Sequence, residues 1–116
     1  DEEIIDATTT KVEDPLIEKI VELVKANLQN PEFNVKSLAD MLFMSQPTLY
    51  RKVKQITGFT IIELVRGVRL KEAAELLKTK QYGIQEVSEM VGYNDVPTFR
   101  KHFVALYGTT PSTFAG

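Results

Sequence analysis

The segment from Thr60 to Lys80 carries an apolar stripe that changes sides halfway along. It has no proline, its second half is rich in helix formers, and Thr60 with Glu63 forms a capping-box pattern at its start. At about 100° per residue, the apolar side chains fall on two nearly opposite sides: Ile61, Leu64, Val65 and Val68 on the first, and Leu70, Ala73, Ala74 and Leu77 on the second. Because a helix packed on one core keeps its stripe on one side, we expect a long helix over 60–80 that connects two small helical subdomains.

Cap residues predict further helices on both sides of this connector. Each apolar pattern follows an N-cap residue or a chain break, Asn30-Pro31 ends the first, and a glycine ends two of the others, at Gly58 and Gly108. Upstream, the predicted helices are 14–30 after Asp14, 35–42 after Asn34, and 46–56 between Ser45 and Gly58. Downstream, they are 84–91 after Gly83, 95–107 between Asp95 and Gly108, and a short helix that opens at Thr110-Pro111. The chain is therefore expected to be all-α, with about seven helices.

The two sides of the connector repeat one pattern. Fifty positions apart, the matches are Pro47 with Pro97, Thr48 with Thr98, Gly58 with Gly108 and Thr60 with Thr110. Upstream, at an offset of forty-nine, they are Val35 with Ile84, Leu38 with Val87, Met41 with Met90 and Leu42 with Val91. Two short helices around a tight turn are typical of a helix-turn-helix, so we expect one over 35–57 and a second over 84–107, both homeodomain-like.

The connector length fits the spacing of grooves in DNA. A helix of about twenty residues is roughly 28–30 Å long, and successive major-groove openings on one face of B-form DNA are about 34 Å apart. One chain could therefore place two recognition helices in neighbouring grooves without forming a dimer.

The outward residues of the two recognition helices are the candidate DNA-binding residues. Leu49 and Val53 in the first helix, and Phe99 and Phe103 in the second, fall on the core side. The residues left outward or at the rim are Ser45, Gln46, Pro47, Thr48, Tyr50, Arg51, Lys54, Asp95, Val96, Pro97, Thr98, Arg100 and Lys101. Arginine can pair bidentately with guanine, glutamine with adenine, and threonine or valine methyl groups can contact thymine.

The composition excludes several classes of function. There is no cysteine and a single histidine, so a disulfide, a thiolate or a zinc site is not expected. No nucleophile with a base and no phosphate-binding glycine loop supports an enzyme, and no cofactor is implied. No apolar run is long enough to span a bilayer, so we expect no membrane contact by this fragment and a cytoplasmic location.

The charge is distributed unevenly along the chain. The net charge is −2, but residues 1–14 carry six acids against Lys11, which leaves +3 for residues 15–116. We expect residues 1–13 to form an acidic linker or arm, and residues 14–116 to form a mildly basic DNA-binding domain.

The sequence resembles the DNA-binding domain of AraC/XylS-type transcription regulators over about residues 14 to 115. The resemblance is carried by the segments Val91-Gly92-Tyr93-Asn94-Asp95, Tyr107-Gly108-Thr109-Thr110-Pro111, Leu49-Tyr50-Arg51-Lys52 and Arg69-Leu70-Lys71. The sequences of the last two segments are similar to those in the C-terminal output domains of hybrid two-component sensors. The resemblance implies a seven-helix fold with two motifs, double-stranded promoter DNA and RNA polymerase as partners, and a sensory or receiver module, or a histidine kinase, upstream.

Some residues leave a second hypothesis open. Phe43 stands where the family usually has glycine, and a phenylalanine does not easily adopt positive φ, so we expect a reshaped first turn and a re-aimed recognition helix. Phe43, the apolar Val96 and the low net charge together motivate the alternative of a helical protein-interaction module that has lost DNA contact.

Two further residues have expected roles outside the recognition helices' candidate set. Arg69 could reach DNA, but the favoured role is to tie the subdomains together by bonding helix-end carbonyls. His102 is expected at a polar or phosphate-contacting rim.

Overall fold

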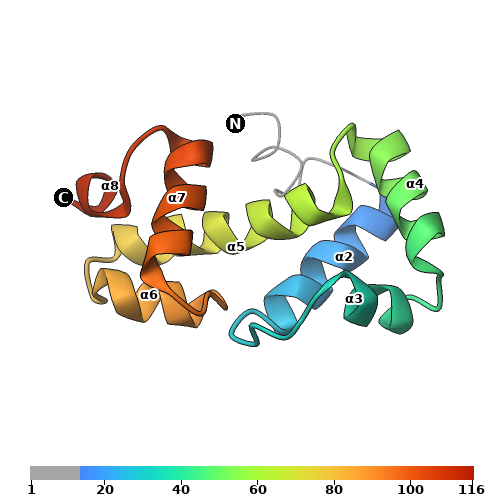
Figure 1. Ribbon diagram of the computed structural model, residues 1–116, viewed down its shortest axis with the longest axis horizontal. Coiled ribbons are helices and arrows are strands. Elements are labelled where there is room, and N and C mark those ends of the chain that lie inside the picture. The colour runs from blue at the N-terminus through green and yellow to red at the C-terminus, as the bar shows by residue number, and fades with distance from the viewer. Residues whose placement is uncertain (1–13) are drawn as a thin grey trace.

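The computed structural model describes residues 14–116, which form seven α-helices and, within that range, no β-strand. The helices are α2 (Pro15–Ala26), α3 (Val35–Met41), α4 (Gln46–Thr57), α5 (Ile61–Lys78), α6 (Ile84–Met90), α7 (Val96–Tyr107) and α8 (Pro111–Ala115). Helix α5 crosses the molecule, with α2, α3 and α4 at one end and α6, α7 and α8 at the other (Figure 1). The predicted all-α fold of two helix-turn-helix subdomains on a central helix is confirmed. The acidic arm expected over 1–13 lies outside the described residues.

Side-chain caps begin the two recognition helices, α4 and α7. The Ser45 hydroxyl accepts from the Thr48 N–H at 3.2 Å, and the Asp95 carboxylate accepts from the Thr98 N–H at 2.7 Å. Helices α4 and α7 both end at a glycine with left-handed backbone, Gly58 and Gly108, so the chain can turn sharply back toward the core. The same local chemistry therefore sets both ends of both recognition helices.

Helix α2 ends earlier than expected, at Ala26 instead of near residue 30. The Asn27 side-chain amide donates to the Leu23 carbonyl at 2.8 Å and stops the helix there. The carbonyls of Leu28 and Asn30 then accept hydrogen bonds from Arg69, more than thirty-eight residues away in the sequence. A contact so distant in the chain was not visible in the local apolar pattern.

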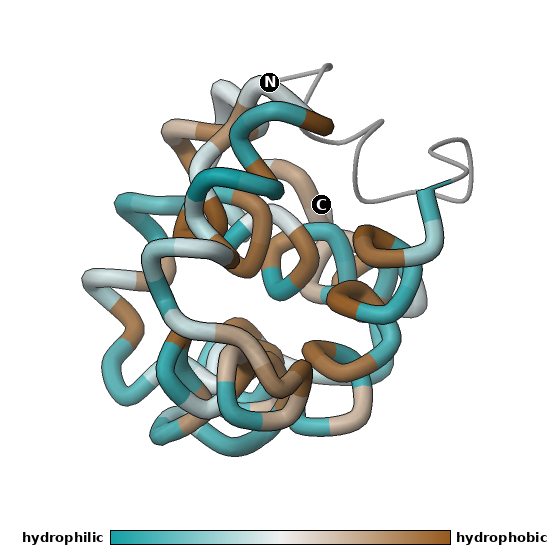
Figure 2. The backbone as a smooth tube through the Cα atoms, turned by 90° about the vertical axis from the view of Figure 1, so that its right-hand side faces the viewer, coloured by the Kyte–Doolittle hydropathy of each residue, from teal (hydrophilic) through white to brown (hydrophobic). Residues whose placement is uncertain are grey.

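Two separate cores lie against α5, as the change of stripe predicts. The first half of α5 places Ile61, Leu64 and Val68 against α2, α3 and α4. The second half places its buried residues against α6, α7 and α8, and these are Leu70, Ala73, Ala74 and Leu77. Seen from the end that carries α2, α3 and α4, short apolar stretches alternate with hydrophilic ones along the helices (Figure 2). Each motif is thus stabilised by its own half of one shared helix.

Arg69 joins the two halves at the middle of α5. Only 7% of its surface is exposed, and its guanidinium donates to four backbone carbonyls. Three belong to the segment between α2 and α3, at Leu28, Asn30 and Phe33, and the fourth is that of Val91 at the end of α6, at 2.7 Å. The predicted structural role of Arg69 is confirmed, because these bonds satisfy carbonyls from both subdomains at once.

The first turn is not reshaped, contrary to the expectation from Phe43. Phe43 adopts a φ of +56°, and the first turn makes the same backbone hydrogen bonds as the second turn. In the first turn Phe43 N donates to Asp40 O and Met44 N to Ala39 O, and in the second Gly92 N donates to Glu89 O and Tyr93 N to Ser88 O. The Phe43 side chain is 96% exposed, so nothing obstructs it, and the cost is limited to left-handed backbone strain.

Candidate nucleic-acid interface

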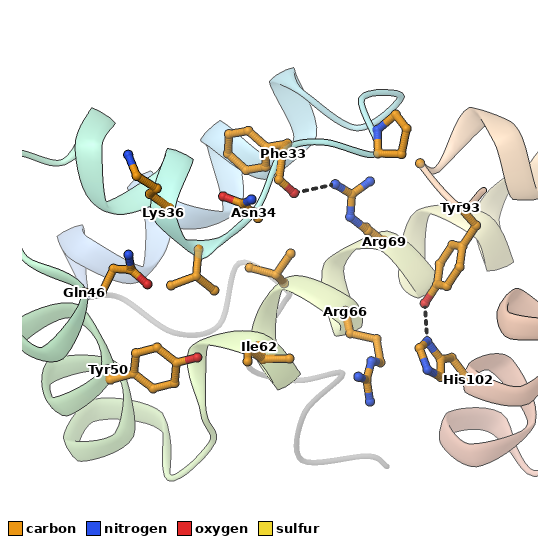
Figure 3. Close-up of a pocket in the computed structure, with 14 residues that line it drawn as sticks. Phe33, Asn34, Lys36, Gln46, Tyr50, Ile62, Arg66, Arg69, Tyr93 and His102 are labelled. Carbon is orange, nitrogen blue, oxygen red and sulfur yellow. Dashed lines mark hydrogen bonds between the residues drawn. The ribbon is translucent and has the colours of Figure 1, made fainter.

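The two recognition helices border one groove. Gln46 and Tyr50 from the first two turns of α4 line one side of it, and His102 from α7 lines the other together with Tyr93 from the preceding turn. Figure 3 shows these side chains on either side of α5. The groove encloses about 480 Å³, and we call it the inter-motif groove. One face of α4 and one face of α7 therefore border the same groove.

The candidate residues of α4 lie on its outer surface and at its ends. Two are half-buried, Thr48 and Tyr50, and the others are exposed: Ser45, Gln46, Pro47, Arg51 and Lys54. The Ser45 hydroxyl is occupied by Thr48 as an N-cap. Lys54 donates to the Gly58 carbonyl at 2.7 Å at the far end of the helix. Among these candidates, Gln46 and Arg51 are therefore the long polar side chains that the described residues leave available for bases.

The candidate residues of α7 have a similar distribution. Val96 is half-buried, and the others are exposed: Asp95, Pro97, Thr98, Arg100 and Lys101. The Asp95 carboxylate holds the Thr98 N–H, and this backbone bond lowers the pKa of Asp95 below its usual value. Asp95 is thus a cap that fixes the start of the helix, while Arg100 and Lys101 present positive charge to solvent.

The inter-motif groove is positively charged although the chain as a whole is not. Its floor is the flank of α5 that carries Arg66 and Arg69, and Lys36 from α3 lies at its edge. Within residues 14–116, no aspartate or glutamate lines it. A concave surface with one sign of charge concentrates the electrostatic potential, in this case one that attracts anions.

Tyr93 and His102 form a polar pair on the wall of this groove. The Tyr93 hydroxyl and His102 Nδ1 are 2.8 Å apart, and the two rings meet edge to face. Partial burial lowers the pKa of His102 below its usual value, and the positive charges of Arg66 and Lys101 lower it further. Burial also raises the pKa of Tyr93 to about 12, so its hydroxyl keeps its proton and remains a donor.

The sequence identified Gln46 and Tyr50 on the groove and placed His102 at a polar rim, but it missed Lys36, Arg66 and Tyr93. Arg66 did carry a detectable signal. On a helical wheel Arg66 falls on the side opposite the first apolar stripe, so in the first half of α5 it points away from the core that this half packs against. Lys36 and Tyr93 reach the groove from α3 and from a turn, so only the packed structure brings them there.

Two other features are absent from residues 14–116. These residues contain no cluster of three or more histidine, cysteine, aspartate or glutamate side chains that could hold a metal ion. They also contain no helix with the length and apolarity needed to cross a bilayer.

Two helix-turn-helix families match the sequence. The family described as "Helix-turn-helix domain" matches residues 38–116, and the "Mga helix-turn-helix domain" matches residues 16–59. Among curated relatives, the protein named Histidine kinase P4 of Formosa agariphila is 34% identical over 107 residues, which cover 92% of this chain and 8% of that protein. The transcriptional regulatory protein YesN of Bacillus subtilis is 35% identical over 102 residues, which cover 85% of this chain and 28% of that protein. The chain thus spans less than a third of the length of either relative.

Solved structures share the fold along most of the chain. The C-terminal domain of AraT, a response regulator from Geobacillus stearothermophilus, superposes with a TM-score of 0.80 at 27% identity, covering 88% of this chain and 84% of that one. The DNA-binding domain of AdpA, solved in complex with a target DNA, superposes with a TM-score of 0.78 at 28% identity, covering 88% and 90%. Family match, relatives and fold agree, and this chain belongs to the AraC-type helix-turn-helix family of transcription regulators.

Proposed function

We propose that this chain is a sequence-specific double-stranded DNA-binding module and the output part of a two-component signalling protein. The observation that carries the proposal is the inter-motif groove, because two recognition helices related by an internal repeat both border it. A duplex lying along that side would meet both helices in succession. The DNA complex of the similar AdpA domain supports the same partner for this chain.

We propose that three exposed side chains read bases. Gln46 in the first turn of α4, Arg51 in its second turn and Arg100 in the second turn of α7 are exposed, and the N-terminal part of a recognition helix contacts base edges. Ser45 and Asp95 would act indirectly, since both are caps that position the helix N-termini. Backbone N–H groups at those N-termini would hold phosphates.

The wider assignment follows from the relatives. We infer that residues 14–116 form the DNA-binding domain, with helix-turn-helix motifs at 35–57 and 84–107, and that residues 1–13 lead from an upstream sensor or receiver module. A relative named as a histidine kinase and a similar response-regulator domain support this arrangement. Promoter DNA and RNA polymerase would be the partners, in the cytoplasm, and the chemistry of any kinase would lie in another part of the protein.

Selection of bound duplexes from a random pool, followed by fluorescence anisotropy, tests the proposal. We expect a defined binding sequence and an affinity that falls steeply as salt rises, because neutralised phosphates release counterions. Arg51→Ala and Arg100→Ala should each weaken binding to the selected duplex by about 1–3 kcal/mol and relax preference at one position. Unchanged affinity in both variants would contradict the assigned faces.

The alternative of a protein-interaction module rests on exposed apolar residues. Phe43 is 96% exposed and Val104, on the second recognition helix, is 38% exposed. Titration with random duplex DNA at low salt separates the two functions, since a DNA-binding module retains sequence-independent affinity under those conditions. No measurable binding to any duplex would favour the interaction module.

A further inference from the structure

We propose that the inter-motif groove is a third DNA contact, in which Arg66 binds the phosphate backbone of the duplex segment between the two recognition helices. The proposal rests on the proposed function and deepens it. It assigns a positioning role to a residue of the connector helix, outside both helix-turn-helix motifs.

The first argument is position. Ile62, Val65, Arg66 and Arg69 line the groove from α5, between the wall formed by α4 and the wall formed by the turn before α7 and α7 itself. A duplex that contacts both recognition helices has to pass over this floor. Its two backbones between neighbouring major grooves border the minor groove, so phosphates are the groups that come nearest to α5.

The second argument is which cations in the groove remain available. Arg69 is buried and its guanidinium is already bonded to four carbonyls. Lys36 is paired with the Asp40 carboxylate at 3.1 Å. Among the partners that residues 14–116 offer, Arg66 has neither a hydrogen bond nor an ion pair, and its side chain is exposed. Figure 3 shows its guanidinium pointing away from α5, between Tyr50 and His102.

The third argument is the set of neighbours around Arg66. Tyr93 provides a hydroxyl and His102 a ring, and within the described residues no carboxylate on the groove competes for the guanidinium. The positive charge of Arg66 adds to the burial that lowers the pKa of His102, and it opposes the rise that burial causes in the pKa of Tyr93, so the guanidinium lies near both side chains. An anion placed there would relieve the repulsion between Arg66 and a protonated His102. Arginine and tyrosine are both common phosphate-contacting residues in protein–DNA interfaces.

The test compares charge-removing and charge-keeping substitutions on one helix. Arg66→Gln and Arg66→Lys are titrated against the selected duplex and against random duplexes at several salt concentrations. Lys78→Gln removes a charge at the end of the same helix, outside the groove, and controls for net charge. Circular dichroism of each variant checks that the fold is intact. Arg66 is exposed and unbonded in the described structure, so we expect unchanged helicity.

Arg66→Gln is expected to weaken binding about fivefold and to reduce the slope of log affinity against log salt by about 0.9, the value for one lost phosphate contact on duplex DNA. The loss should be equal for selected and random duplexes because phosphates carry no sequence information. Arg66→Lys should retain most of the affinity, and Lys78→Gln should change it less than twofold.

An unchanged salt slope in Arg66→Gln would overturn the proposal, as would an equal loss in Lys78→Gln. A loss confined to one spacer sequence would also overturn it, since that result would mean base or shape readout. All three outcomes leave the proposed function standing. Failure of the unmodified chain to bind any duplex would instead contradict DNA binding itself.

Discussion

The two helix-turn-helix motifs share the backbone of their turns but differ in what surrounds them. Phe43 in the first turn and Gly92 in the second both have positive φ, at +56° and +88°, and both turns make the same pair of backbone hydrogen bonds. Phe43 points into solvent. A Cβ at Gly92 would overlap the Arg69 guanidinium and lie 2.5 Å from the Leu28 carbonyl oxygen. The motif alone therefore tolerates a side chain at this position, and the junction between the subdomains excludes one.

The largest expected effect comes from Gly92→Ala. The new methyl group would displace Arg69 and strain the backbone, leaving several carbonyls without their charged donor. We expect a loss of about 3 kcal/mol or more in the free energy of unfolding, measured by urea denaturation. The matched control is Phe43→Ala, which keeps a Cβ at the equivalent position of the first turn and should change stability by less than about 0.5 kcal/mol. Equal losses in the free energy of unfolding for the two variants would contradict the proposed difference between the two turns.

Arg69→Lys should have the next largest effect. Lysine keeps the charge but replaces the planar fork, which reaches carbonyls on both subdomains, with a single ammonium group. We expect a loss of about 2 kcal/mol in urea denaturation, because hydrogen bonds to charged groups contribute about 1.5–3 kcal/mol each and lysine can retain some of them. In the Gly92→Ala background the same substitution should add little, since Arg69 is already displaced there. Fully additive losses would contradict the assigned contact.

Phe43→Gly should stabilise the protein. Glycine adopts the left-handed backbone without the clash of a Cβ, and no buried contact is lost because the phenylalanine side chain lies in solvent. The expected gain is about 0.5–1 kcal/mol, smaller than the relieved strain because glycine also makes the unfolded chain more flexible. Thermal and urea unfolding of the two proteins side by side would measure it. A destabilised variant would mean that the Phe43 side chain makes a favourable contact.

The smallest expected effect is on the pH dependence of stability, and it comes from a residue pair that distinguishes the second motif from the first. The second motif has the Tyr93–His102 pair where the first has Met44 and Lys52. The pKa of His102 is lowered in the folded state, so the unfolded chain binds a proton more readily. Stability should therefore fall as the pH drops below about 6.5, the usual histidine value, and the fall should cease once the pH is below the folded pKa. His102→Gln should flatten this part of the stability profile, and an unaltered profile would show that His102 does not cause it.

The sequence predicted the helices because their signals are local. Asn34, Ser45, Thr60 and Asp95 each cap the helix that they were expected to cap. The two-sided stripe of α5 predicted two cores, and the structure contains both. These features depend on residues within a few positions of one another, which a single sequence displays directly.

The errors and omissions have a common cause. The path of the chain after α2 depends on contacts from Arg69, and the conformation of the first turn depends on the open space around Phe43. The inter-motif groove collects side chains from α3, α4, α5, α7 and a turn. None of these can be read from spacing along the chain, because each is decided by which distant segments meet after packing.

The division of α5 between two cores fixes the relative azimuth of the motifs as well as their separation. One residue inserted between Val68 and Leu70 would rotate everything downstream by about 100° around the rod and carry α7 off the side that α4 occupies. Seven inserted residues would return it to within about 20° but move it roughly 10 Å along the axis. The length and rotation of α5 would then determine the distance between half-sites in any duplex that both motifs bind at once.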